Sequence, residues 1–99
     1  EVFEPDGRML VGVARLLNLS VQGACVESTS HFPESARYLL RLLLDDRRLI
    51  SIDGEVLWRR PFAHMTEYGF KFDPYPPMDQ TRVLEFVKKY FSGGRPGGK

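Results

Sequence analysis

Two hydrogen-bonding side chains and a glycine, Asn18, Ser20 and Gly23, occupy a short stretch between two apolar runs of the chain. The amide of Asn18 and the hydroxyl of Ser20 can each both donate and accept hydrogen bonds. Residues two apart in an extended segment point to the same face, so both side chains would meet one partner. Gly23 would let the chain turn with φ > 0, or let a ligand approach bare backbone. We therefore expect a ligand to be recognised along residues 18–23.

The spacing Asn18-x-Ser20-x-x-Gly23 resembles the Asp/Asn-x-Ser-x-x-Gly motif of the PilZ domain family, whose members are bacterial receptors for cyclic di-GMP. The resemblance implies that Asn18 and Ser20 hydrogen-bond a guanine edge and that Gly23 lets the base come close to the strand. Members often have Asp at the first position, so Asn18 keeps an acceptor without the charge, which implies somewhat weaker binding. A turn that satisfies its own backbone is the alternative interpretation of these three residues.

The order of the elements after this motif is also similar to that of PilZ domains. An apolar strand is expected over residues 38–44, a second over 50–58 and a third over 68–72, and a C-terminal helix follows. The resemblance covers most of the chain, from Arg8 to about Phe91. It implies a mainly β fold, an antiparallel six-stranded (five to seven) β-barrel of PilZ type with one C-terminal α-helix as a lid.

Alternation of apolar and polar residues, with proline and glycine between the runs, places the element boundaries. The clearest strand carries Ile50, Val56 and Trp58 on one apolar face. Pro61 ends this strand, because proline cannot donate a hydrogen bond to a ladder. A helix is the competing prediction for residues 37–45, since Leu and Arg are good helix formers. The expected strands cover residues 9–17, 23–28, 37–45, 49–59 and 67–73, with a charged turn at 45–48 and a helix from an N-cap at Asp79 to Phe91, whose stripe is Val83, Phe86, Val87 and Tyr90.

The family has a second ligand motif, RxxxR, before its first strand, and this motif is absent from the chain. Upstream of Asn18 the only basic residues are Arg8 and Arg15, which are seven residues apart. Two explanations stay open: the arginine segment precedes Glu1 in a parent protein, or the domain has lost strong nucleotide binding. The start at Glu rather than Met favours an internal fragment. Without two arginines on a mobile arm we expect weak affinity for cyclic di-GMP.

Trp58 and Arg60 are further candidates for the ligand site. By resemblance, Trp58 lies at the end of a strand that runs beside the motif, so the indole either stacks on the ligand or packs in the core. Arg60 follows Trp58 by two residues, so in a regular strand both side chains point to the same face. Its guanidinium fork is suited to phosphate, although a solvated strand-end charge is the simpler interpretation.

Net charge, aromatic pattern and cysteine content argue against several classes of function. A net charge of +1 argues against a general nucleic-acid binder, which needs a clustered positive field. The alternating Tyr68, Phe70 and Phe72 are explained by core packing rather than by base stacking. Cys25 is the only cysteine, which excludes an intramolecular disulfide and favours the reducing cytoplasm. No apolar run approaches the roughly 20 residues of a membrane span, and direct membrane contact is not expected.

Neither catalysis nor metal binding is predicted. His31 and His64 are far apart and have no Cys, Asp or Glu at ligand spacing, and Ser20 has no histidine placed to activate it. Residues 1–91 are expected to form one domain, and 92–99 a flexible Gly-rich tail. The sequence therefore predicts a regulatory module that binds cyclic di-GMP, without a cofactor, and acts on an attached or partner signalling protein. The alternative is a degenerate PilZ-like module that binds another protein and no nucleotide.

Overall fold

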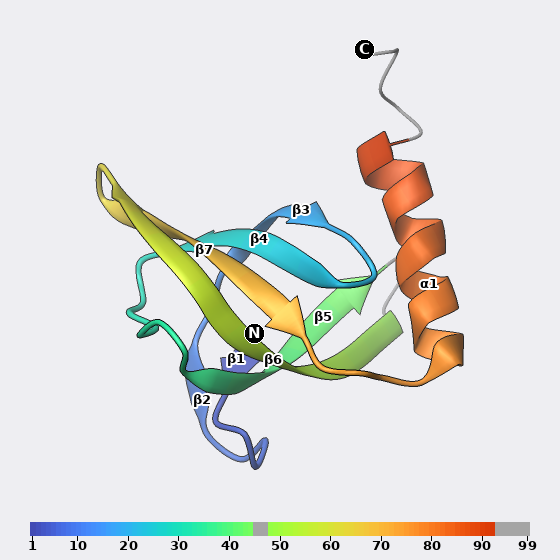
Figure 1. Ribbon diagram of the computed structural model, residues 1–99, viewed down its shortest axis with the longest axis horizontal. Helices are drawn as coiled ribbons and strands as arrows, with labels where there is room; N and C mark the ends of the chain where they lie inside the picture. Colours follow the sequence, from blue (N-terminus) through green and yellow to red (C-terminus); the bar gives the residue numbers. More distant parts are fainter. Residues whose placement is uncertain (45–47, 93–99) are drawn as a thin grey trace.

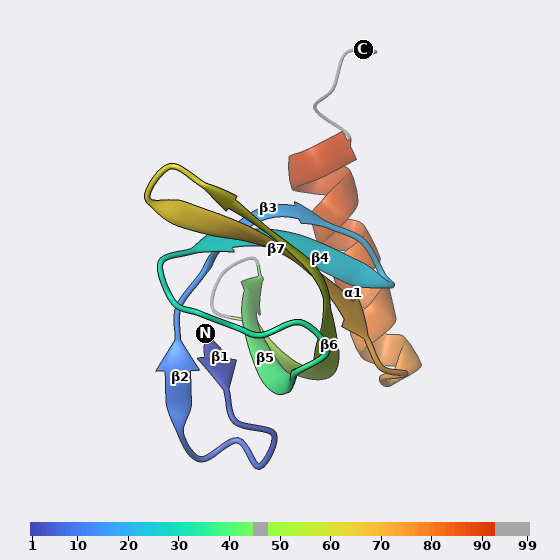
Figure 2. The same cartoon turned by 60° about the vertical axis from the view of Figure 1, so that its left-hand side comes forward.

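Seven antiparallel strands form one sheet in the order β2-β1-β5-β6-β7-β4-β3. The computed structural model describes residues 1–44 and 48–92. The sheet curls so that its two halves face each other as an open barrel, and the helix α1 stands against one end of it (Figures 1 and 2). The predicted mainly β fold with a C-terminal helix is confirmed. The elements are β1 (Val2–Phe3), β2 (Leu10–Gly12), β3 (Arg15–Leu19), β4 (Gly23–Ser28), β5 (Arg37–Leu44), β6 (Arg48–Phe62), β7 (Met65–Phe72), α1 (Pro77–Val87) and a π-helical turn η1 (Lys88–Ser92).

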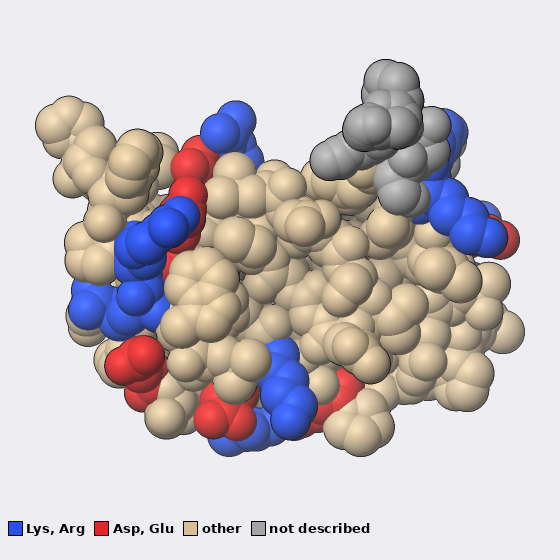
Figure 3. Space-filling model, turned by 45° about the horizontal axis from the view of Figure 1, so that its top comes forward, with Lys and Arg blue, Asp and Glu red and all other residues tan. Residues whose placement is uncertain are grey.

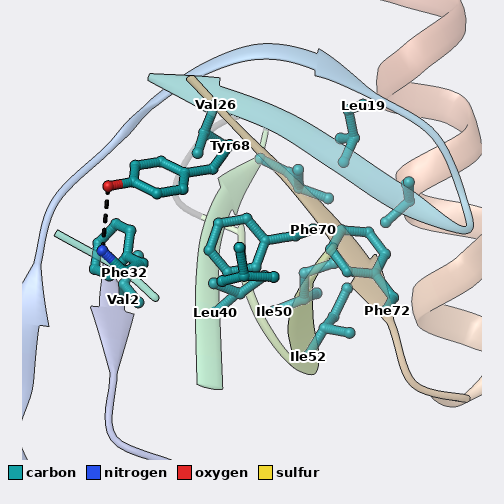
Figure 4. Packing of buried hydrophobic residues seen from close by; sticks show 13 residues of the cluster. Val2, Leu19, Val26, Phe32, Leu40, Ile50, Ile52, Tyr68, Phe70 and Phe72 are labelled. Carbon is teal, nitrogen blue, oxygen red and sulfur yellow. Dashed lines mark hydrogen bonds between the residues drawn. The ribbon is translucent and has the colours of Figure 1, made fainter. Parts of the chain in front are cut away.

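The hydrophobic core lies between the facing halves of the curled sheet (Figure 4). Strand alternation builds it: Ile50 and Ile52 of β6 are buried, whereas the intervening Ser51 is exposed. Burial of one such side chain is worth about 1.5–3 kcal/mol. The other buried apolar residues are Val2, Leu19, Val26, Phe32, Leu40, Leu44, Val56, Tyr68, Phe70, Phe72 and Val83.

β-Bulges in β6 and in β3 interrupt the alternation of side chains between the two faces of the sheet. The register of β6 against β7 shifts between Val56 and Trp58, and that of β3 against β4 shifts between Leu16 and Asn18. Each bulge adds one residue, so every later side chain moves to the other face of its strand. The prediction that Trp58 shares the inner face with Val56 is therefore wrong: Leu57 and Trp58 are 52% and 41% exposed.

The N-terminal part of the sheet is more divided than predicted. The expected strand over residues 9–17 is two strands, β2 and β3, and β3 continues through Asn18 to Leu19.

Gly7 has φ 76° and is the only glycine in residues 1–44 and 48–92 with positive φ, so the positive φ considered for Gly23 is wrong. Gly23 starts β4, where a Cβ atom would lie 2.3 Å from the Phe70 carbonyl oxygen. A close approach of β4 to β7 therefore requires this glycine.

The β6–β7 hairpin is longer than predicted. Strand β6 continues through Pro61 to Phe62, and β7 begins at Met65 rather than Glu67, so the two strands meet in a tight turn. Strand β5 pairs with β6 only as far as Glu55. Val56 still bonds to the backbone of Ser35 and Ala36, and after Val56 the strand β6 pairs with β7 alone among the described residues. Proline is tolerated in such an edge segment. The hairpin projects from the body of the sheet (Figure 1). The charged turn predicted at 45–48 falls largely on residues 45–47, outside the described residues.

Helix α1 begins at Pro77, with Pro76 as its N-cap, so the prediction of Asp79 as the N-cap is wrong. Proline is favoured in the first turn because its missing N–H would have no partner there. Asp79 lies in this first turn instead, where its charge complements the helix dipole. In the described part of the chain no helix has the length and apolar character to cross a membrane.

The apolar stripe of the helix is centred on Val83, which is fully buried. The predicted stripe continued to Tyr90, but Phe91 packs against the core in its place and Tyr90 is exposed. The π-helical turn explains this, because its wider turn delays the return of a side chain to the same face. The predicted tail lies outside the described residues from position 93 onward.

A buried hydroxyl fixes the loop between β4 and β5. The Tyr68 hydroxyl donates to the Ser30 carbonyl oxygen at 2.7 Å. It also accepts from the Phe32 backbone N–H at 3.1 Å (Figure 4). We predict that Tyr68→Phe lowers the free energy of unfolding by about 1–3 kcal/mol, because a buried N–H loses its acceptor. Denaturant unfolding measures this. Tyr38→Phe is the matched control, since the Tyr38 hydroxyl bonds to none of the described residues. Equal losses in both variants would contradict the prediction.

Candidate functional site

Outward-facing residues of four neighbouring strands form a continuous row. Asn18 of β3 pairs with Cys25 of β4, Cys25 pairs with Gly69 of β7, and Gly69 pairs with Trp58 of β6. We call these four residues the site row. Its two ends come from the two bulged strands, and its centre consists of small residues. The row therefore has a shallow floor between an amide at one end and an indole at the other.

The indole of Trp58 lies directly on Gly69. A Cβ atom on Gly69 would be 2.2 Å from Nε1 and 2.3 Å from Cε2 of Trp58, so no larger residue fits beneath the ring. Trp58 remains 41% exposed in this position. A flat aromatic surface that is supported from below and open to solvent is suited to stacking on a nucleic-acid base.

Asn18 presents a hydrogen-bond donor to solvent. Its Oδ1 accepts from the Leu19 backbone N–H at 2.9 Å, which holds the side chain in place. The side chain is exposed, and its amide nitrogen donates to no group among residues 1–44 and 48–92. The two N–H groups of the amide are thus free for a ligand.

The hydroxyl of Ser20 is engaged within its own turn. It accepts from the backbone N–H groups of Gln22 and Gly23, both at 3.2 Å, and donates to the Gly23 carbonyl oxygen at 3.3 Å. These bonds use the one donor and both lone pairs of a hydroxyl. In this conformation Ser20 shapes the turn after Asn18, in line with the self-satisfying turn considered as the alternative from the sequence.

An open depression of about 980 Å³ surrounds the site row. Four of the five residues singled out in the sequence line it: Asn18, Ser20, Gly23 and Trp58. Arg60 is not among them. Pairing between distant strands brings further residues into the lining that were not predicted as site residues from the sequence; these include Cys25, Leu57, Gly69, Lys71, Asp73, Tyr75 and Gln80.

Arg60 belongs to a ladder of charges beside the site row. Arg60 pairs with Glu67, Glu67 lies opposite Glu27, and Glu27 pairs with Arg15, across four strands. The ion pairs measure 2.5 Å at Arg60 and 2.6 Å at Arg15. Figure 3 shows basic and acidic side chains gathered in a band on the left of the face that it draws. Arg60 does share the outer face with Trp58, but its guanidinium is held by a carboxylate outside the depression.

Cys25 contributes a thiol to the floor of the site row. Burial raises its pKa, the nearby charge of Glu67 raises it further, and Arg60 acts in the opposite direction. The thiol is thus mainly protonated at neutral pH. In the described ranges no three His, Cys, Asp or Glu side chains gather closely enough to hold a metal ion.

Comparison with protein families gives one result: the sequence model of the PilZ domain matches residues 2–89. The matched span contains all seven strands and α1. Neither the curated proteins nor the solved structures gave a match.

The contact between Trp58 and Gly69 is open to a direct test. We predict that Gly69→Ala displaces the indole, because the added methyl group would occupy the position of the ring. Trp58 is the only tryptophan, so its fluorescence emission should shift to longer wavelength and its acrylamide quenching should rise. Ser51→Ala, an exposed change elsewhere on β6, should alter neither signal. Unchanged emission in a folded Gly69→Ala variant would show that the ring does not rest on residue 69.

Proposed function

Because the chain belongs to the PilZ domain family, we propose that it is a cytoplasmic regulatory module that binds cyclic di-GMP within a larger bacterial protein. The family is one of binding domains rather than enzymes. The observation that carries the proposal for this chain is the site row, which joins the motif residue Asn18 to Trp58 across the sheet.

The site row offers two complementary contacts for one guanine nucleotide. The base stacks on the indole of Trp58, which Gly69 supports, and the free amide donor of Asn18 bonds to an acceptor of the ligand. Neighbouring strands are about 4.8 Å apart, so the row spans roughly 14 Å along the sheet, enough for a base and its ribose phosphate. Ser20 acts by holding the turn that presents Asn18.

A hydrogen-bonded path connects the motif turn to the helix. The Tyr75 hydroxyl donates to the Val21 carbonyl oxygen at 2.8 Å, and the Gln80 side-chain amide donates to the Tyr75 carbonyl oxygen at 2.7 Å. A ligand that favours one conformation of the turn would thereby shift the position of α1. We propose this shift as the signal passed to an attached or partner protein. Where a parent protein carries RxxxR before Glu1, that arm would close over the nucleotide.

A protein-interaction module that needs no nucleotide is the second candidate. Two observations favour it: the Ser20 hydroxyl is used within its own turn, and residues 1–17 contain no arginine pair with RxxxR spacing. The projecting hairpin exposes Leu57, Phe62 and Met65, apolar side chains that a partner could cover. Binding of cyclic di-GMP separates the two candidates.

Titration calorimetry with cyclic di-GMP is the primary test. We predict a dissociation constant in the micromolar range, weakened about 5- to 150-fold by Trp58→Ala, because stacking on an aromatic ring is worth about 1–3 kcal/mol per base. Trp58→Phe should lose less, since it keeps a ring. Glu34→Ala, an exposed change in the loop before β5, serves as the control. Absence of binding below the high micromolar range would refute the receptor function and favour the second candidate.

Alkylation of Cys25 provides an independent readout of the same site. Because its pKa is raised, the thiol should react with iodoacetamide more slowly than free cysteine at pH 8, and the rate should increase with pH beyond the usual midpoint. Bound cyclic di-GMP covers the floor of the row and should slow the reaction several-fold at every pH. A rate that stays constant at saturating nucleotide would place the ligand elsewhere.

A further inference from the structure

Among the described residues that line the depression, Lys71 is the only cation, and it lies beside the site row. It follows Gly69 by two residues on the outer face of β7, so the two positions are roughly 7 Å apart. In the sheet Lys71 lies opposite Gly23 of β4 on one side and Glu55 of β6 on the other. The motif glycine therefore adjoins an exposed lysine.

Two carboxylates near Lys71 are held by another residue: Glu55 lies opposite it on β6, and Asp73 follows it by two residues. Arg37 of β5 forms ion pairs with both Glu55, at 3.5 Å, and Asp73. Across residues 1–44 and 48–92, Lys71 forms no ion pair and its ammonium makes no hydrogen bond. Because Arg37 binds these carboxylates, the Lys71 ammonium at the edge of the depression has no ion-pair partner in the part of the chain that the structure describes.

The other cations near the site row are held elsewhere. Arg15 is bound to Glu27, and Arg60 to Glu67, within the charge ladder on the opposite side of the row. Beside Lys71, the paired residue Gly23 has no side chain, and the next outer position on β7, Gly69, lies beneath the indole of Trp58. Lys71 is consequently the cation that an anionic ligand in the depression would meet.

We propose that Lys71 determines specificity for a phosphodiester: its ammonium binds a phosphate of the nucleotide whose base lies on Trp58. A lysine ammonium is a compact charge that forms charge-assisted hydrogen bonds with phosphate oxygens. This role rests on the proposed cyclic di-GMP function and adds the group that recognises the backbone of the ligand. Lys71 would thus supply a phosphate contact that does not depend on an arginine arm.

The test separates the effect of the positive charge at position 71 from the effect of the aliphatic part of the side chain. In calorimetric titrations with cyclic di-GMP at 20 mM and 300 mM salt, Lys71→Met should weaken binding about 10-fold or more at low salt, the size typical of a hydrogen bond to a charged group. The salt dependence should also decrease, because an ion contact is lost. Lys71→Arg should restore most of the affinity. Lys88→Met, an exposed change in η1 that lies away from the depression, is the matched control.

Each result has a separate meaning. Loss of affinity in Lys71→Met with recovery in Lys71→Arg, at unchanged thermal unfolding temperature and Trp58 emission, supports the phosphate contact. Wild-type affinity and salt dependence in Lys71→Met would overturn the role of Lys71 and leave the cyclic di-GMP function standing. Failure of the unaltered protein to bind would overturn the cyclic di-GMP function and this inference with it.

Discussion

The extra residue Leu57 in β6 decides what the outer surface of this protein presents. Side chains of a strand alternate between two faces, so one inserted residue exchanges the faces of all that follow. Without the bulge Trp58 would point into a core that Val56 and Tyr68 already fill. With it, Trp58 lies on Gly69 and remains open to solvent. Arg59 takes the inner position opposite Tyr68 as a result, and its Nε atom is buried without a partner among the described residues.

The rest of the outer face follows from this register. On one side of the site row, the charge ladder places two glutamates next to each other and an arginine at each end, which offsets their repulsion. On the other side, Arg37 forms ion pairs with the acidic residues near Lys71. Between them the floor consists of Cys25 and Gly69. The centre has small residues, one flank has ion-paired arginines, and the other flank has a lysine that forms no ion pair with the described residues. This chemistry is suited to a nucleotide.

Local patterns in the sequence were enough to predict the class of fold and the motif. The pairing between distant strands could not be predicted from them. Alternation located the middle of every long strand, and the spacing of Asn18, Ser20 and Gly23 indicated the turn. The bulges carry no local signal, so Trp58 was assigned to the wrong face. Pro61 was read as a strand end because its edge position depends on where β5 stops pairing. Gly69 was overlooked, although a glycine between two core aromatic residues of a strand indicates a close approach of another group.

The central claim, that Asn18 and Trp58 are two ends of one ligand site, can be tested most directly by NMR. The chain has one asparagine and one tryptophan, so the side-chain amide of Asn18 and the indole N–H of Trp58 give identifiable signals in ¹⁵N-labelled protein. Titration with cyclic di-GMP should shift both signals along a single saturation curve. Saturation at different concentrations, or movement of neither signal while others respond, would contradict a shared site.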